Sequence, residues 1–115
     1  MRDEQAIEKE IQTKGLNAPR LNPAHIDAQI VDEQYYVFPS TSLTVCALTL
    51  RNGFQVVGES ASASKENFDE AIGRKIARDN ARNKIWMLEG YLLRSRLSGH
   101  EAGVPIAGSG GPASV

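Results

Sequence analysis

A chain of 115 residues with a formal net charge of −1 is long enough for one domain with a modest core and too short for two. The near-neutral charge excludes a field that would draw the whole molecule onto nucleic acid or an anionic membrane, so binding by charge requires a local patch. No stretch approaches the ~18 apolar residues of a membrane span, and the charged N-terminus is unlike a secretory signal. We therefore expect a cytoplasmic protein with no membrane partner.

The N-terminal part predicts two short helices. Residues 1–14 form a polar helix with a thin apolar stripe, which ends at Gly15 because a left-handed residue commonly closes a helix. A second helix is predicted over residues 22–32, with Asn22 as the N-cap and Pro23 at the first helical position. The second helix carries no lysine or arginine, so we do not expect this pair to read DNA as a helix-turn-helix.

A small antiparallel sheet is predicted in the middle of the chain. Residues 35–38 are rich in β-forming side chains and predict an edge strand that stops at a proline. Two further β-rich runs, 43–51 and 54–60, flank Asn-Gly, which favours a two-residue type I′ hairpin. That turn would place Thr49 opposite Val56. A lone hairpin is marginal, so the first strand should join it and a helix should cover one side.

One long helix is predicted over residues 65–97, with Ser64 as its N-cap. Its first half shows apolar residues at helical spacing, which predicts a buried face made of Phe68, Ala71, Ile72 and Ile76. Its second half, residues 85–97, is apolar around most of its circumference, more than a small sheet can cover. The helix would span roughly 50 Å, about twice the ~26 Å expected for this domain, so it should bend at Gly90 or reach a neighbour.

These elements predict an α+β fold and a homo-oligomer. Residues 1–98 would form a single domain, in which the long helix serves both packing and oligomerisation. Residues 99–115 consist largely of Gly, Ala, Ser and Pro, and we expect this tail to be disordered because it lacks bulky side chains to pack.

No recognised catalytic constellation is present, so we expect a protein that is not an enzyme and needs no cofactor. His25 and His100 lie in different regions without partners at ligand spacing, and we read each as a solvated surface residue. The lone cysteine, Cys46, excludes an internal disulfide and a cysteine-based zinc site, and it falls in an apolar strand. No metal site is predicted.

The best candidate for a ligand site is a row of arginines on the long helix. Arg74, Arg78 and Arg82 repeat every four residues, with Lys75 beside them, so their planar guanidiniums could cradle phosphates. The alternative is a solvated helix face partly neutralised by pairs along the helix. Three further residues complete the candidate set. The two asparagines among them could satisfy backbone groups, form hydrogen bonds across an interface or bind the polar edge of a ligand, and all three could line a pocket between subunits. They are Asn80, Asn83 and Tyr91.

Several motifs tie the chain to a known family. They are LRNGF at 50–54, GESA at 58–61, ENFD at 66–69, IGRKIAR at 72–78, KIW at 84–86 and LEGYLL at 88–93. With them the chain resembles a family of small phage and prophage proteins, typified by gene product forty-nine of one podophage and gene sixty-six of another, from about residue 7 to residue 97. Met87 stands where many relatives have proline, so the family's reason for a kink before Gly90 is missing here. The resemblance implies an accessory phage protein acting in the bacterial cytoplasm.

Three hypotheses follow for the function. The first is a non-catalytic binding module that counters host defence, most concretely an oligomeric sponge for a nucleotide immune signal such as a cyclic ADP-ribose isomer or a cyclic oligonucleotide. The second is a protein-binding inhibitor or adaptor of a host or defence protein. The third is a nucleic-acid-associated phage factor, which the near-neutral charge and the lack of a dense basic and aromatic surface disfavour.

Overall fold

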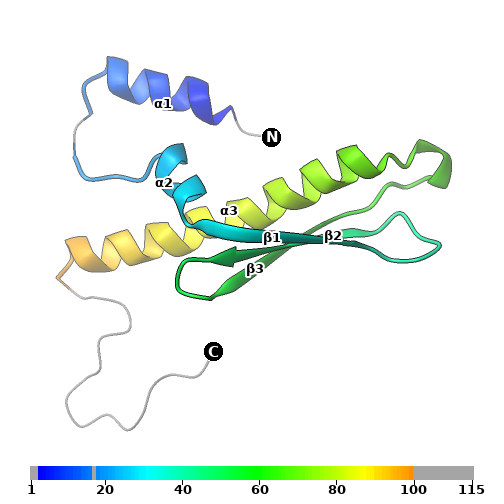
Figure 1. The fold of residues 1–115 in the computed structure, drawn as a ribbon. Coiled ribbons are helices and arrows are strands. Elements are labelled where there is room, and N and C mark those ends of the chain that lie inside the picture. The colour runs from blue at the N-terminus through cyan, green and yellow to red at the C-terminus, as the bar shows by residue number, and fades with distance from the viewer. Residues whose placement is uncertain (1–2, 17, 100–115) are drawn as a thin grey trace, which may run out of the picture.

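The computed structural model describes residues 3–16 and 18–99, and its fold is α+β, as predicted (Figure 1). Two N-terminal helices precede a three-stranded antiparallel sheet, and a long helix ends the described chain. The elements are α1 (Glu4–Thr13), α2 (Pro23–Ala28), β1 (Ile30–Val37), β2 (Thr44–Leu50), β3 (Gln55–Ser60), the 3-10 turn η1 (Lys65–Asn67) and α3 (Glu70–Leu97). The tail predicted to be disordered lies outside the described residues, except for its first residue.

The N-terminal helices form where the capping residues place them. Asp3 caps α1 by accepting from the Ala6 N–H, and Gly15 follows this helix with a φ of +66°. The predicted cap of α2 is confirmed, since the Asn22 side chain accepts from the next turn. The prediction that this helix runs to residue 32 is wrong: it ends at Ala28, because Ile30 already pairs with β2 and strand pairing overrides the local helical pattern.

The sheet has the order β1-β2-β3, and its hairpin differs from the prediction by one residue. Thr49 lies opposite Gln55, not Val56, because the loop holds three residues, 51–53, instead of two. The Leu50 N–H donates to the Phe54 carbonyl across this loop, and Gly53 takes a φ of +89°, which suits a turn closed by a glycine bulge. The shift places Leu48 opposite Val56, so both can point into the core.

The core lies between the sheet and α3. Its buried apolar side chains come from α2, β2, β3 and α3: Ile26, Cys46, Leu48, Leu50, Val56, Ala77, Ala81 and Ile85. The helix approaches β3 very closely, since a Cβ added to Gly58 would lie 2.1 Å from the backbone nitrogen of Ala81. Only small side chains fit at this contact, which is why the row Gly73, Ala77 and Ala81 faces the sheet.

The predicted buried face of the long helix is therefore wrong. Ile72 and Ile76 are 56% and 42% exposed, because they lie beside the buried row and do not belong to it. The predicted start is wrong as well. Ser64 makes no capping bond to the backbone, the turn η1 intervenes, and Asp69 caps α3 by accepting from the Ile72 N–H.

The C-terminal half of α3 reaches past the sheet. The whole of α3, with 28 residues, spans about 42 Å, whereas the strands of six to eight residues span about 20–27 Å. In Figure 1 the yellow-to-orange part of the helix extends beyond the strands, with α2 near its middle. The helix runs through Gly90 without a break, so the excess length is accommodated by projection.

Candidate functional site

The three arginines of the predicted row each form an ion pair within the chain. Arg74, nearest the start of α3, pairs with Glu70 one turn earlier at 2.8 Å between Nη2 and Oε1. Its guanidinium carbon lies 5.5 Å from the centroid of the Tyr35 ring on β1, a cation–π arrangement. About half of the Arg74 side chain is exposed, so solvent screens the pair with Glu70 and makes it weak.

Arg78 pairs across to the sheet. Its Nε donates to Oε2 of Glu33 on β1 at 3.1 Å, and the other oxygen of that carboxylate accepts from the Tyr35 hydroxyl at 2.8 Å. Burial, together with this hydrogen bond to Glu33, raises the pKa of Tyr35 far above its usual value, so the phenol stays a donor. About a third of the Arg78 side chain is exposed, which leaves it within reach of a ligand.

Arg82 is largely buried, and all three nitrogens of its guanidinium donate hydrogen bonds. Its Nε donates to Asp27 at 2.8 Å, one Nη to Glu4 at 2.6 Å and the other to the Pro23 carbonyl at 3.3 Å, with 11% of the side chain exposed. Burial lowers the pKa of Arg82, and the hydrogen bonds to Asp27 and Glu4 outweigh burial and raise it. This residue ties α1, α2 and α3 together, so an anion at the row would meet Arg74 and Arg78 first.

The other predicted site residues do not converge on one place. Asn80 donates from Nδ2 to the Glu59 carbonyl at 2.8 Å and so supports the edge strand β3, beside a hollow of about 260 Å³. Lys75 and Asn83 are exposed on α3. Tyr91 is 70% exposed and lies about 16 Å farther along the helix than Asn80, so one chain cannot bring both to a small ligand.

The projecting half of α3 carries an uncovered apolar surface. Its most exposed members are Met87 at 69% and Tyr91 at 70%, with Leu97 at 53%. We call these three side chains the α3 overhang. Single exposed apolar residues are ordinary, whereas several gathered on one projecting helix are typical of an association surface.

The comparison with protein families shows to which family the chain belongs. Residues 21–97 match the model of the phage protein family described as N4 Gp49/phage Sf6 gene 66. The chain belongs to this phage protein family. The match covers the sheet, α2 and α3, and it begins after α1, later than the resemblance from about residue 7 suggested. No curated protein and no solved structure gives a significant match to the chain.

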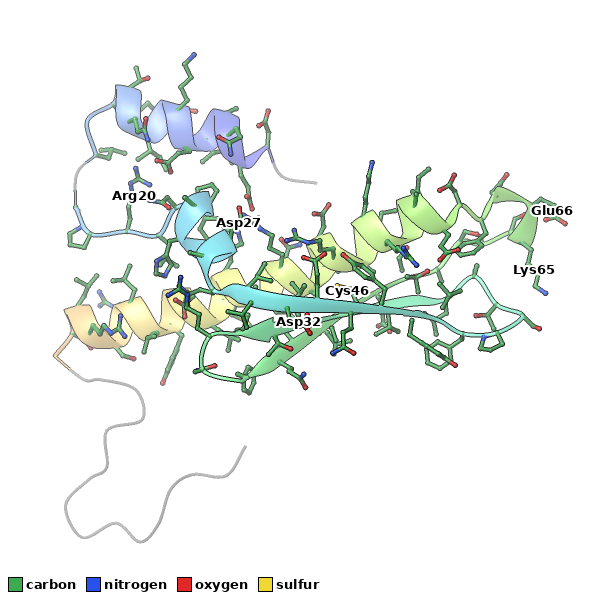
Figure 2. All side chains as sticks on the ribbon, viewed as in Figure 1. Arg20, Asp27, Asp32, Cys46, Lys65 and Glu66 are labelled. Atoms are coloured by element: carbon green, nitrogen blue, oxygen red, sulfur yellow. The ribbon has the colours of Figure 1, made fainter. Side chains whose placement is uncertain are left out.

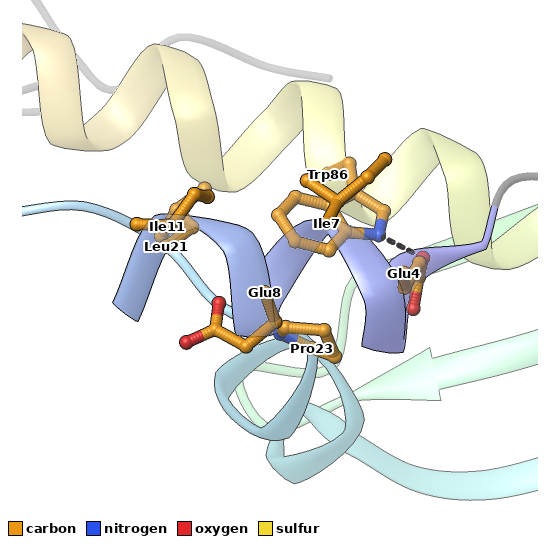
Figure 3. A pocket seen from close by; sticks show the side chains of 7 residues that line it. All are labelled: Glu4, Ile7, Glu8, Ile11, Leu21, Pro23 and Trp86. Carbon is orange, nitrogen blue, oxygen red and sulfur yellow. Dashed lines mark hydrogen bonds between the residues drawn. The ribbon is translucent and has the colours of Figure 1, made fainter. Parts of the chain in front are cut away.

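In this member of the phage family, α1 lies before the matched region and yet has specific contacts. Glu4 binds Arg82 and also accepts from the Trp86 indole N–H at 2.8 Å, as the dashed line in Figure 3 shows. Glu8 forms a two-fold pair with Arg20, which lies in the connector next to α2 (Figure 2). Sequence reasoning missed this contact. The available signal was the repeat of glutamate every four residues beside the apolar stripe of α1.

His25 lies on the surface of this family member, as predicted, but it has a partner that the sequence did not reveal. The Nε2 atom of His25 lies 2.8 Å from Oε1 of Glu89, so this histidine has a carboxylate partner and links α2 to α3. His100 lies outside the described residues.

Burial raises the pKa of the Cys46 thiol, which packs in the core. Within residues 3–16 and 18–99, no cluster of His, Cys, Asp or Glu is arranged to hold a metal ion, and no helix could cross a bilayer.

Proposed function

We propose that the chain is a non-catalytic binding module with which a phage counters a host defence, and that it acts in the bacterial cytoplasm as a homo-oligomer that sequesters a phosphate-bearing nucleotide signal. Cyclic ADP-ribose isomers and cyclic oligonucleotides are the ligand classes to test. Membership of the phage protein family supports the setting. The exposed arginines of α3 support binding of a phosphate, and the α3 overhang supports an oligomer.

The observation that carries the ligand part is the pair of Arg74 and Arg78. They lie one turn apart on α3, both are partly exposed, and a single carboxylate orients each of them. Partly exposed ion pairs of this kind contribute about 0–1 kcal/mol, so a negatively charged phosphate group can compete with the carboxylate for the guanidinium fork. Tyr35 beneath Arg74 adds an aromatic surface.

The homo-oligomer enters because the hollows described beside α1, α2 and β3 are too small for a nucleotide. These three hollows measure about 110, 180 and 260 Å³, below the ~300–1,000 Å³ of small-molecule sites. A second copy would supply the missing wall. The α3 overhang is the surface that would bring it, since each large apolar side chain transferred from water into an interface contributes roughly 1.5–3 kcal/mol.

Calorimetric titration of cyclic ADP-ribose isomers and cyclic dinucleotides into matched variants tests the ligand part. We expect Arg78→Ala to weaken nucleotide binding roughly ten- to a hundred-fold, because a charge-assisted contact is lost. Arg78→Lys should also weaken it, since lysine keeps the charge and loses the planar fork. Arg96→Ala, which makes the same charge change on an exposed residue of the last turn, is the control and should bind as the wild type does.

A variant that is expected to increase the affinity for the nucleotide provides a second test. Glu33→Gln removes the carboxylate that holds Arg78 and keeps an oxygen to accept from the Tyr35 hydroxyl. We expect this variant to bind the nucleotide more tightly than the wild type does, because the ligand no longer competes with a charge. Equal affinity of the wild type, Glu33→Gln and Arg78→Ala would place the ligand elsewhere.

The second candidate is a protein-binding inhibitor or adaptor, and the α3 overhang favours it. Large exposed apolar side chains suit a protein partner better than a nucleotide. Native mass spectrometry of protein purified from infected or defence-expressing cells separates the two candidates. A retained nucleotide of a few hundred daltons per site supports the sponge, and a retained host protein in the absence of nucleotide supports the inhibitor.

A further inference from the structure

The helix α1 is loosely packed on the rest of the described chain. It contributes no buried residue, and it precedes the region shared with the family. Its stripe residue Ile7 is 49% exposed even in the docked position. A helix held this loosely has little apolar burial to keep it in place, so the polar contacts of Glu4 and Glu8 decide its position.

The first of these contacts is a built carboxylate site. Glu4 accepts from Arg82 at 2.6 Å and from the Trp86 indole at 2.8 Å. Both donors come from α3, one turn apart, and the Arg82 side chain is almost completely buried. Asp27 already balances the charge of that guanidinium from within α2, so the site accepts a second carboxylate that neutrality does not require.

The second contact lies at the other end of the same surface. Arg20 donates to both oxygens of Glu8 at 2.7 and 2.8 Å. This hydrogen bond, opposed by burial, lowers the pKa of Glu8, so its carboxyl stays charged at neutral pH. Between the two contacts lies a hollow of about 110 Å³, and Figure 3 shows the side chains that face it from α1, from the connector with α2, and from α3. They are Glu4, Ile7, Glu8, Ile11, Leu21, Pro23 and Trp86.

The surface beneath α1 is therefore complementary to a defined pattern of side chains. The pattern is two carboxylates four residues apart and two branched apolar side chains four residues apart on one helix face. In α1 these are Glu4 and Glu8, and Ile7 and Ile11. Arginine at each end and apolar Leu21, Pro23 and Trp86 between them are the complement of that pattern. Helix-in-groove recognition uses anchors at this spacing.

We propose that the surface of α2 and α3 beneath α1 is a groove for an acidic amphipathic helix of a protein partner, and that α1 occupies it as an internal competitor. The partner helix displaces α1, and its carboxylate takes the place of Glu4 on Arg82 and Trp86. Charge complementarity at both ends of the groove selects this partner over a neutral or basic helix. The proposal is independent of any nucleotide ligand.

The test uses the full-length chain and a fluorescein-labelled, end-capped peptide of residues 1–14 as the partner helix. Glu4→Gln in the protein weakens the internal competitor, so the fraction of open groove rises and the peptide should bind at least tenfold tighter than to the wild type. Glu10→Gln is the matched control. It removes one charge from α1 in an exposed pair with Lys14, away from the groove, and should bind the peptide as the wild type does.

Two further measurements make the result decisive. Trp86 is the only tryptophan of the chain, so its emission should shift to the red in Glu4→Gln and stay unchanged in Glu10→Gln, which reports release of α1 without any peptide. A peptide with glutamine in place of Glu4 should bind the Glu4→Gln protein at least tenfold more weakly than the unaltered peptide. The proposal would be overturned if the wild type, Glu4→Gln and Glu10→Gln proteins bound the peptide equally. It would also be overturned if the Glu4→Gln protein bound both peptides equally.

Discussion

The two halves of α3 use opposite kinds of side chain. The first half lies on the sheet and buries the small residues Gly73, Ala77 and Ala81 against β2 and β3, and this contact ends at Ile85, just past the midpoint of the helix. The second half has most of the large apolar residues of the helix and leaves Met87 and Tyr91 exposed. The comparison teaches that the density of large apolar side chains does not locate the core. Close approach of two backbones locates it, and we propose that the large exposed residues of the second half form a surface for association.

The largest expected effect comes from the contact that brings the first half close. Gly58→Ala would place a Cβ 2.1 Å from the Ala81 nitrogen and 2.3 Å from the Ala77 carbonyl oxygen, so the helix must move away from the sheet. We expect a loss of more than about 3 kcal/mol, beyond the usual cost of overpacking. Urea denaturation followed by circular dichroism measures it. A loss below ~1 kcal/mol would show that the helix is not held this close.

A pair of alanine substitutions compares the halves directly. Ile85→Ala removes a fully buried side chain and should cost about 3 kcal/mol, within the ~2–5 kcal/mol typical of such cavities. Met87→Ala, two residues later and largely exposed, should change the free energy of unfolding by less than ~0.5 kcal/mol under conditions where the chain is monomeric. Similar losses for both variants, measured by urea denaturation at low protein concentration, would contradict the division of α3.

The glycine of the second half should behave oppositely to Gly58. A Cβ at Gly90 would meet only the Leu21 side chain at 4.0 Å, an ordinary contact, and the residue lies inside a regular helix. We expect Gly90→Ala to stabilise the chain by about 0.5–1 kcal/mol, because alanine restricts the unfolded state and favours the helix. Thermal unfolding by calorimetry measures this gain. A destabilised Gly90→Ala variant would indicate a bend or a close neighbour at this position.

The smallest expected effect concerns a buried hydroxyl beneath the start of α3. Thr44 is fully buried, its Oγ1 has no hydrogen-bond partner within the described chain, and a Cβ on Gly73 would lie 3.0 Å from that oxygen. Thr44→Val keeps the shape and removes the unsatisfied group, so we expect no loss and a gain of up to about 1 kcal/mol in urea denaturation. A clear loss of stability would reveal a partner for the hydroxyl, such as a buried water.

Much of the fold could be predicted from local signals. The cap at Asn22, the left-handed Gly15 and the β-rich runs around Asn52 and Gly53 placed most elements, because capping and turn residues act within a few positions. The hairpin register and the end of α2 could not be derived this way. The register depends on a three-residue loop that places Leu48 opposite Val56, and the end of α2 depends on the pairing of Ile30 with β2. Both involve packing or pairing between separate segments.

The buried face of α3 and the use of its arginines needed the structure for the same reason. Large Ile72 and Ile76 predicted a core face, and only the contact at Gly58 shows why the small residues at 73, 77 and 81 occupy it. Arg82 could not be separated from Arg74 and Arg78 in the sequence, because its partners, Glu4 and Asp27, lie more than fifty positions away.

The size of the native particle tests most directly whether the second half of α3 is a binding surface. Light scattering on the wild type at micromolar concentration should give a multiple of the 12.5 kDa chain mass. Tyr91→Asp should shift the mass to a single chain, whereas Tyr36→Asp, a matched change of an exposed tyrosine on β1, should leave the oligomer intact. A wild type of 12.5 kDa, or a Tyr91→Asp oligomer of unchanged mass, would contradict the assignment of the α3 overhang to self-association.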